Sequence, residues 1–371
     1  MQRWEKLALS MKEQGIDEIV VASQHAVRYL SGYSPDLEIG PNAMDPGPAV
    51  LRIERDGDAL AGVMLLPNGA EAGIGAKRIA CIGYDNYDVQ TPGFDRLAAY
   101  RSGLAAWAQG RRGSGRKTAA EGGFLPLAAA AALGLDTGAD DCTPLLNRIR
   151  QVKDEDELQA LRAAAQLANF GQHAVRRFAL EGVSEIECYG QVKAAIEQAA
   201  GKRLPLLVDF VSGARTADIG GYPSDRKLQA GDLLLTDLVP HLDGYWGDSC
   251  SVMAIGTYTA RQLEVRKHVK EALELAKASI KPGASVAGTD RVVRDYLARF
   301  GLSFPHHTGH GLGVQCHEAP LISMNGDAAY EENMVIALEP GAYLADEGFG
   351  IRLEDVGRVT ANGFEQWTQY E

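Results

Sequence analysis

The sequence of 371 residues is poor in cysteine and contains no long apolar run. Its five cysteines are scattered and form no Cys-x-x-Cys pair: Cys81, Cys142, Cys188, Cys250 and Cys316. This pattern excludes a disulfide framework and a thiolate zinc site, and it favours a reducing, cytoplasmic location. No apolar run approaches the roughly 18 residues that span a bilayer, and residues 1–17 lack the apolar centre of a secretory signal.

Basic residues are outnumbered by acidic residues, since the chain has 37 Lys and Arg and 49 Asp and Glu, which gives a net charge of −12. An acidic surface repels phosphate backbones and anionic lipids, so we expect no nucleic-acid partner and no membrane partner. The stretch GRRGSGRKT at 110–118 resembles a phosphate-binding loop. However, Arg116 separates the second glycine from the lysine, and we interpret the stretch as a solvated loop.

The chain is too long for one core and shows two patterns of elements. Residues 1–145 alternate helix-like and strand-like segments and predict an α/β domain, whereas residues 146–371 combine long helices with glycine-punctuated strands and predict an α+β domain. Helices are expected before Gly15 and over 97–108, 154–180, 184–200 and 261–279. Strands are expected over 16–22, 49–53, 59–66, 79–82, 206–211, 232–238, 247–254 and 334–338.

Four carboxylates lie in or beside predicted strands, where acidic residues are depleted. Asp237 near the end of one strand and Asp248 near the start of the next would lie side by side in a hairpin. Glu339 ends an apolar run, and Glu354 falls inside another predicted strand. Each alone fits an ordinary strand-end carboxylate. Together with the glycine-flanked His310 they indicate a cation site, because adjacent carboxylates repel unless a cation lies between them.

Four of the eight histidines fall within residues 306–317, which read HHTGHGLGVQCH. The cluster fits a metal site, a catalytic base with its support, or a histidine-rich loop. Oxygen-rich ligands with a single imidazole suit Mn²⁺, Co²⁺, Fe²⁺ or Zn²⁺. Four carboxylates balance two divalent ions better than one, and a water held between two ions would ionise near neutral pH and act as the nucleophile.

These residues resemble those of the pita-bread metallopeptidases, which include prolidase, aminopeptidase P, methionine aminopeptidase and the metal-free creatinase. The similarity rests on the order of the five candidate ligands and on short motifs: GIDEIVV, RYLSGY, RQVKDEDEL, GHGLG, HEAP, LEPG and IRLED. It extends over nearly the whole chain and is strongest for the Xaa-Pro peptidase branch. It implies a creatinase-type N-terminal domain over 1–145, a pita-bread catalytic domain over 146–371, and a homodimer.

The resemblance also implies roles for single residues. Asp248 and Glu354 would bridge two metal ions, Asp237 would hold one ion, and His310 with Glu339 would hold the other. The remaining implied roles are substrate contact and stabilisation of the tetrahedral intermediate by His306 and His317, proton acceptance by Glu339, and orientation of the carboxylates by Arg352. His307 has no role in the family pattern and is expected to pack, and His241 is expected at the surface of the hairpin tip.

One departure concerns the loop SGARTADIGG at 212–221. Gly220 stands where prolidase-like sequences carry a substrate-contacting histidine, which puts specificity for proline in question. Arg215 and Tyr222 in the same region are candidate replacement contacts, although both also fit ordinary loop residues.

The function that follows is a dinuclear metal-dependent hydrolase of the Xaa-Pro peptidase type. Hydroxide held by the ions would cleave an amide bond in a small peptide, with manganese as the expected metal and cobalt, zinc or iron also suited to the ligands. A second hypothesis keeps the site but assigns a non-peptide substrate, as in an ectoine-type amidohydrolase or a dimethylsulfoniopropionate lyase. A third, a non-catalytic binding scaffold, is disfavoured because all five ligands are present.

Overall fold

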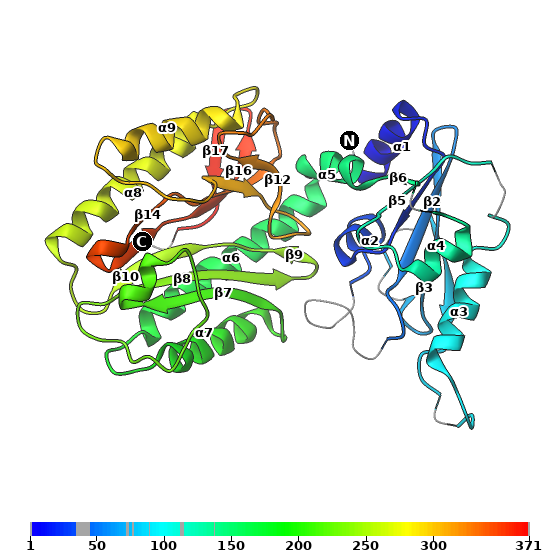
Figure 1. Ribbon diagram of the computed structural model, residues 1–371, viewed down its shortest axis with the longest axis horizontal. Helices are drawn as coiled ribbons and strands as arrows, with labels where there is room; N and C mark the ends of the chain where they lie inside the picture. The colour runs from blue at the N-terminus through cyan, green and yellow to red at the C-terminus, as the bar shows by residue number, and fades with distance from the viewer. Residues whose placement is uncertain are drawn as a thin grey trace. The chain divides into compact units, whose positions relative to one another are not determined.

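The computed structural model describes residues 2–34, 45–71, 74–75, 78–88, 90–111, 115–136 and 138–369. Its contacts divide the chain into two compact units, Met1–Arg150 and Gln151–Glu371 (Figure 1). The predicted boundary after residue 145 lies inside helix α5 (Thr143–Gln151). Residues 112–114 of the loop expected at 110–118 lie outside the described residues.

The N-terminal unit is built on a six-stranded mixed sheet with the order β4-β3-β2-β1-β5-β6. Strand β1 (Glu18–Val21) is buried at all four positions and pairs antiparallel with β2 and parallel with β5. The other strands are β2 (Val50–Asp56), β3 (Ala59–Pro67), β4 (Ile79–Tyr84), β5 (Thr118–Ala120) and β6 (Asp140–Asp141). The helices that accompany α5 are α1 (Arg3–Glu13), α2 (Gln24–Ser31), α3 (Arg96–Trp107) and α4 (Leu127–Leu133).

The C-terminal unit combines four helices with three sheets. The helices are α6 (Glu155–Phe178), α7 (Glu185–Ala200), α8 (Ala260–Ser279) and α9 (Val286–Ala298). The first sheet has the order β10-β8-β7, with β7 (Leu206–Ser212), β8 (Leu233–Leu242), β10 (Cys250–Ala254) and the short β9 (Tyr245–Trp246) paired to β8. The second has the order β12-β11-β13-β16-β17, with β11 (Gly309–Gly311), β12 (Glu318–Ile322), β13 (Val335–Leu338), β16 (Asp355–Thr360) and β17 (Gly363–Gln366). Strands β14 (Gly341–Leu344) and β15 (Phe349–Arg352) form the third.

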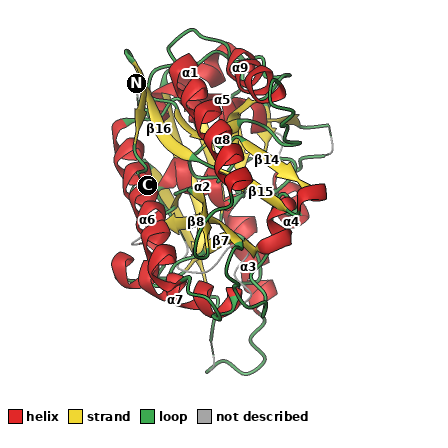
Figure 2. Cartoon of the chain, turned by 90° about the vertical axis from the view of Figure 1, so that its left-hand side faces the viewer, coloured by secondary structure: helices red, strands yellow, loops and turns green. Residues whose placement is uncertain are grey.

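Two apolar cores hold the C-terminal unit together. Helices α6 and α7 pack on the sheet of β7 and β8, and Figure 2 shows both helices bordering these strands. Helices α8 and α9 pack on the five-stranded sheet. The long helices begin as the sequence predicts, since the Asp154 carboxylate accepts a hydrogen bond from Glu157 N at 3.1 Å and Glu157 completes a capping box. The α/β and α+β patterns expected for the two halves are therefore confirmed.

The hairpin that carries the first two candidate ligands is longer than expected. Asp237 lies in the middle of β8 and not near its end. The chain turns only at Asp243 and Gly244, which have φ values of 51° and 88°. Pro240 remains within β8 because the strand needs only its carbonyl, which accepts a hydrogen bond from Gly247 N at 2.8 Å.

Glu354 is the second correction. It lies in the short break between β15 and β16, not within a strand. Its backbone N–H donates to the carbonyl of Cys250 at 3.0 Å, so the break is tied to β10. Among the described residues, no helix is long and apolar enough to cross a membrane.

Candidate metal centre

The five predicted metal ligands line a single cavity of about 410 Å³ in the C-terminal unit. They come from separate segments of the chain: Asp237, Asp248, His310, Glu339 and Glu354. His317 and Cys316 line the same cavity. The structure therefore brings together side chains that the sequence distributes over more than a hundred positions.

Strand pairing explains part of this convergence. In the register of the first sheet, Asp237 on β8 lies opposite Cys250 on β10 and opposite Asp209 on β7. His310 occupies the centre of β11 between two glycines. A Cβ atom on Gly309 would lie 2.1 Å from the carbonyl oxygen of Ala337, so only glycine permits this close pairing of β11 with β13.

The carboxylates of the cavity carry more negative charge than their surroundings neutralise. Burial raises the pKa of Asp248 well above its usual value, and repulsion from Asp237 and Glu339 raises it further. Burial and repulsion from Asp248 raise the pKa of Glu354 in the same way. A divalent cation among these groups would neutralise the repulsion and offset the cost of burial, so the donor set fits a metal.

The imidazole of His310 is suited to bind an ion. It is almost fully buried, and burial lowers its pKa to about 4, so it is neutral at pH 7. Its Nδ1 donates to the carbonyl of Gly311 at 3.0 Å, because a carbonyl can only accept. The Nε2 lone pair is thus left facing Glu339 Oε1 at 3.5 Å and Asp248 Oδ2 at 3.8 Å.

His307 does not simply pack, contrary to expectation. Its Nε2 lies 2.9 Å from Glu339 Oε1. Burial opposes the charge on Glu339, but the contact with His307 and the nearby His310 outweigh it, so the pKa of Glu339 is lowered. One ligand atom from each of His307, His310, His317 and Glu339 lies within 4.8 Å of the others, and the same holds for Asp248, His310 and Glu354.

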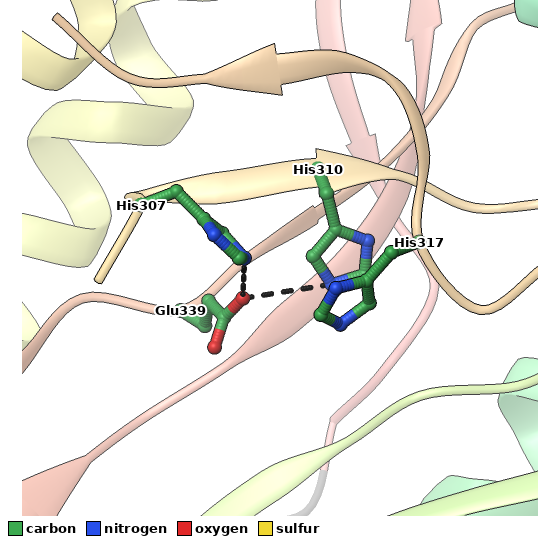
Figure 3. A group of neighbouring side chains, drawn as sticks. All are labelled: His307, His310, His317 and Glu339. Atoms are coloured by element: carbon green, nitrogen blue, oxygen red, sulfur yellow. Dashed lines mark ion pairs between the residues drawn. The ribbon is translucent and has the colours of Figure 1, made fainter. Parts of the chain in front are cut away.

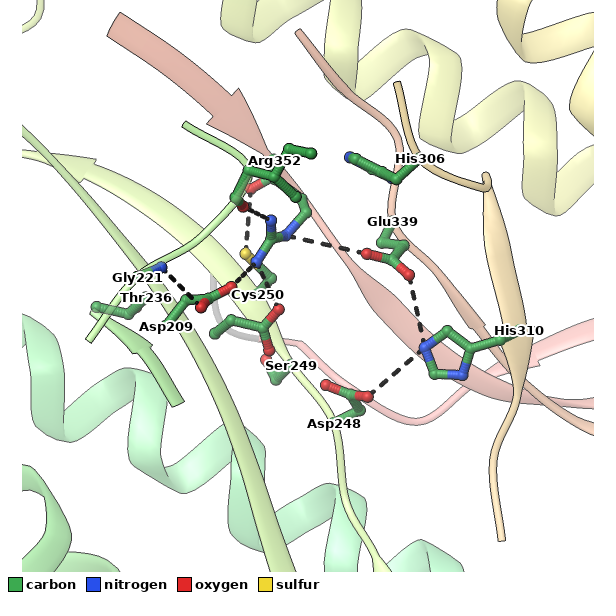
Figure 4. A network of polar contacts seen from close by, with 12 residues as sticks. Asp209, Gly221, Thr236, Asp248, Ser249, Cys250, His306, His310, Glu339 and Arg352 are labelled. Atoms are coloured by element: carbon green, nitrogen blue, oxygen red, sulfur yellow. Dashed lines mark hydrogen bonds and ion pairs between the residues drawn. The ribbon is translucent and has the colours of Figure 1, made fainter. Parts of the chain in front are cut away.

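Arg352 is the cation that contacts this acidic group. Its Nη2 donates to Asp237 Oδ2 at 2.8 Å and to Asp209 Oδ2 at 2.7 Å, and its Nε lies 4.0 Å from Glu339 Oε2. Figure 4 shows the guanidinium between Asp209 and Glu339. One arginine thus lies within 4.0 Å of three carboxylates, and its role in orienting them stays a prediction.

Asp209 is a site residue that the sequence reasoning missed. It is the only charged residue of β7, LLVDFVS, and an acidic residue in such a strand is the same signal that identified Asp237. Its Oδ1 accepts a hydrogen bond from Gly221 N at 2.9 Å. A Cβ atom on Gly220 would lie 2.3 Å from Asp209 Oδ2. The space beside Gly220 is therefore filled by the carboxylate of Asp209.

The other two candidates for substrate contact differ from each other. Arg215 hydrogen-bonds the buried carboxylate of Glu185, and its Nη2 donates to the carbonyl of Tyr222 at 2.8 Å. These contacts fix the loop, and Arg215 is not among the residues that line the cavity. Tyr222 lines the cavity and is 79% exposed.

His306 makes defined contacts that fix its tautomer. Its Nδ1 donates to the carbonyl of His307 at 2.8 Å, so its Nε2 accepts from the Tyr343 hydroxyl at 2.8 Å. Tyr343 in turn accepts from Arg352 Nη1 at 3.2 Å. Nothing in the sequence distinguishes Tyr343 from the other twelve tyrosines. His241 packs against Trp246 near the hairpin tip, with ring centroids 4.5 Å apart.

Comparison with known proteins gives matches over both units. Residues 159–361 match the model of metallopeptidase family M24, and residues 3–152 match the creatinase/prolidase N-terminal domain. The chain is 34% identical to YkvY of Bacillus subtilis over 227 residues, which is 61% of this chain and 62% of that relative. It is 26% identical over 374 residues to the Xaa-Pro dipeptidase of Pyrococcus horikoshii, covering 100% of this chain and 97% of that one.

Solved structures share the fold over the whole chain. The dipeptidase PepE from Mycobacterium ulcerans superposes with a TM-score of 0.78 at 25% identity, covering 99% of this chain and 95% of that one. The prolidase from Pyrococcus horikoshii gives a TM-score of 0.80 at 23% identity, with coverages of 100% and 98%. The pita-bread fold with a creatinase-type N-terminal domain, expected from the motifs, is confirmed.

Proposed function

Because the chain belongs to metallopeptidase family M24 and is a metal-dependent peptidase, we propose that it is a dinuclear Xaa-Pro peptidase acting on small peptides. The observation that carries this proposal is the convergence of Asp237, Asp248, His310, Glu339 and Glu354 on one cavity. Asp248 and Glu354 would contact both ions, Asp237 one ion, and His310 with Glu339 the other. Asp237 Oδ1 supports this assignment, since it is buried and accepts no hydrogen bond from any described residue.

Bound divalent ions supply Lewis acidity and lower the pKa of a water molecule. Proton transfer and stabilisation of the intermediate would fall to side chains of the protein. Glu339 has a lowered pKa, so it is ionised at neutral pH and can accept a proton from the attacking water. His317 borders the cavity, and its neutral ring can donate a hydrogen bond to the oxygen of the tetrahedral intermediate.

His306 and Arg352 would act as positioning groups in this scheme. Tyr343 joins them, since it donates to His306 and accepts from Arg352. Arg352 keeps Asp237 in place through a bond of 2.8 Å. The proton on His306 Nδ1 is held by the carbonyl of His307, so His306 would contact substrate only if Nε2 leaves Tyr343.

One observation favours a second candidate function. Asp209 fills the space beside Gly220, where prolidase-like sequences place a histidine, so this wall of the cavity is acidic where the family pattern is basic. A site altered in this way suits a substrate other than an Xaa-Pro peptide, such as a small amide. A homodimer, a cytoplasmic location and the use of manganese stay predictions.

Metal analysis followed by a substrate panel tests the proposal. The purified protein should contain about two divalent ions per chain, and chelation should abolish hydrolysis. The panel should include Xaa-Pro dipeptides, longer peptides with proline second, and N-acyl or cyclic amides. Cleavage of the proline peptides supports the first candidate, and cleavage of the amides alone supports the second. A metal-free protein without hydrolytic activity would disprove both.

A further inference from the structure

His307 has no counterpart among the residues assigned to the metal centre, yet it lies directly against it. Its Nε2 is 2.9 Å from Glu339 Oε1, and His310 Nε2 is 3.5 Å from the same oxygen. Figure 3 shows the two rings directed at the Glu339 carboxylate from different sides. Both His307 Nε2 and Glu339 Oε1 are buried, and neither makes a hydrogen bond of regular geometry with a described residue.

Ring orientations separate the three histidines of this group. The His307 ring is nearly perpendicular to that of His310, at 88° with centroids 5.5 Å apart, and to that of His317, at 87° and 5.3 Å. The rings of His310 and His317 instead overlap, with a tilt of 33° and centroids only 3.9 Å apart. Overlapping rings cannot easily direct nitrogens at one ion, whereas perpendicular rings can. His307 is therefore the better partner of His310.

The distances between the donor atoms of His307, His310 and Glu339 would suit a shared ion if the side chains moved slightly towards it. Metal–imidazole bonds are about 2.0–2.1 Å long, so two donors of one ion lie roughly 3–4 Å apart. The donor atoms of the group already lie within 4.8 Å of one another, and two of the separations are 2.9 and 3.5 Å. Glu339 follows β13, and its backbone N–H donates to the Thr308 carbonyl at 2.8 Å, which ties it to the segment that carries His307.

We propose that His307 is a metal ligand, and that it forms with His310 and Glu339 a two-histidine, one-carboxylate set for one ion of the centre. This inference rests on the proposed function and adds a ligand that the family pattern lacks. Two imidazoles and one carboxylate are the ligand set of catalytic zinc sites and of non-haem iron sites. His317, whose tilted ring overlaps that of His310, is left available to the substrate.

The two sides of the centre would then differ in chemistry. One ion would be held by oxygens alone, from Asp237 and the shared carboxylates of Asp248 and Glu354, which suit a hard ion such as Mn²⁺. The other ion would have two imidazole nitrogens besides its carboxylate oxygens, and imidazole favours Zn²⁺, Co²⁺ or Fe²⁺. The centre is therefore expected to hold two different ions when both kinds are supplied, and the more tightly bound one should be zinc or cobalt.

Cobalt titration of the full-length protein tests this ligand directly. Protein stripped by a chelator is titrated with Co²⁺ while the visible absorption and the bound metal are measured. For His307→Ala we expect one of the two ions to bind at least about tenfold more weakly, with an altered visible spectrum, since even outer contacts of a metal site cost that much. Free imidazole should restore the spectrum of this variant, which a structural role of His307 would not predict.

Two further variants keep the result interpretable. His173→Ala removes an exposed histidine of α6 and should bind Co²⁺ as the unmodified protein does. His307→Gln preserves side-chain size, and it should weaken the same ion if His307→Ala folds poorly. Unchanged affinity, stoichiometry and spectrum in both His307 variants would overturn the inference and leave the proposed function standing. A parent protein that binds no Co²⁺ would overturn both.

Discussion

Glu121 in the N-terminal unit and Asp248 in the C-terminal unit are both buried carboxylates, with exposed fractions of 1% and 3%. Glu121 accepts hydrogen bonds from Ala22 N at 3.1 Å, Ser23 N at 2.9 Å and Ser23 Oγ at 2.5 Å, and His25 Nε2 lies 3.4 Å away. Burial alone would raise its pKa, but these donors lower it. Asp248 is surrounded by other carboxylates, and its pKa is raised.

Glu185 shows that the difference lies in the donors and not in the unit. It belongs to the C-terminal unit and is completely buried, yet it resembles Glu121. Ser212 and Ser224 donate to it through both backbone and hydroxyl groups, and its pKa is lowered despite burial. In Glu121 and Glu185, two of the three cases, hydrogen-bond donors balance the cost of burial, and the buried carboxylate serves the structure. A shortage of donors, as around Asp248, is what indicates a metal centre.

The largest expected effect comes from neutralising Asp248. Asp248→Asn removes a charge that two ions would share in the proposed centre, so the protein should lose metal, and kcat/KM should fall at least roughly a thousandfold, about 4 kcal/mol. Metal content and hydrolysis of the best panel substrate provide the measurement. Circular dichroism should show both units folded. Retention of two ions with normal turnover would show that Asp248 is satisfied in another way, like Glu121.

The opposite result is expected when Glu121 is neutralised. Glu121→Gln places an amide against backbone N–H groups, so the free energy of unfolding should fall by about 2–3 kcal/mol, while metal content stays unchanged. Glu13→Gln, at an exposed position of α1, is the matched control. Urea denaturation of the three proteins measures the difference. A variant of normal stability that lost metal would reverse the comparison.

The stability difference between the parent protein and Glu121→Gln should depend on pH in a defined direction. The pKa of Glu121 is lower in the folded state than its usual 4.5, so its contribution to stability is complete above that pH. It is lost as the pH falls through the folded-state pKa. The stability difference between the parent protein and Glu121→Gln should therefore be largest near pH 7 and shrink below about pH 4. A difference that grows in acid would contradict the lowered pKa.

The acidic residues of the candidate site were predictable from the sequence, but their donors and exact positions were not. Asp237, Asp248, Glu339 and Glu354 were found because acidic residues interrupt apolar runs, and the same reasoning applied to β7 would have found Asp209. Their exact places were not predictable, because β8 continues through Pro240 and a hydrogen bond from Glu354 N to Cys250 O interrupts the strand between β15 and β16. The donors that satisfy a carboxylate come from distant segments. The sequence therefore could not separate Glu121 and Glu185 from the metal centre, nor assign a contact to His307.

Asp209 is intermediate between the two kinds of carboxylate, because it has donors and also lines the cavity. Asp209→Ala frees Arg352 from one partner, so kcat/KM should fall roughly 10–100-fold. Asp218 is exposed in the loop that follows β7, and Asp218→Ala should have no effect. The double variant Asp209→Ala/Gly220→His also makes room for the family histidine. It should gain activity on Xaa-Pro dipeptides relative to Asp209→Ala, and loss of the remaining activity would refute this account of the pocket.

Tyr343 is expected to have the smallest effect, because it holds a neutral histidine and not a carboxylate. Tyr343→Phe removes the hydroxyl that donates to His306 Nε2 and accepts from Arg352 Nη1. One neutral hydrogen bond contributes about 1 kcal/mol, so kcat should fall about fivefold while metal content stays constant. Tyr330→Phe is the matched control, since this buried hydroxyl donates to Thr289 Oγ1 at 3.0 Å and not to a residue of the candidate metal centre. If both variants lose the same stability but only Tyr343→Phe loses kcat, the loss of kcat comes from the orientation of His306. If both variants keep the same kcat, Tyr343 does not act through His306.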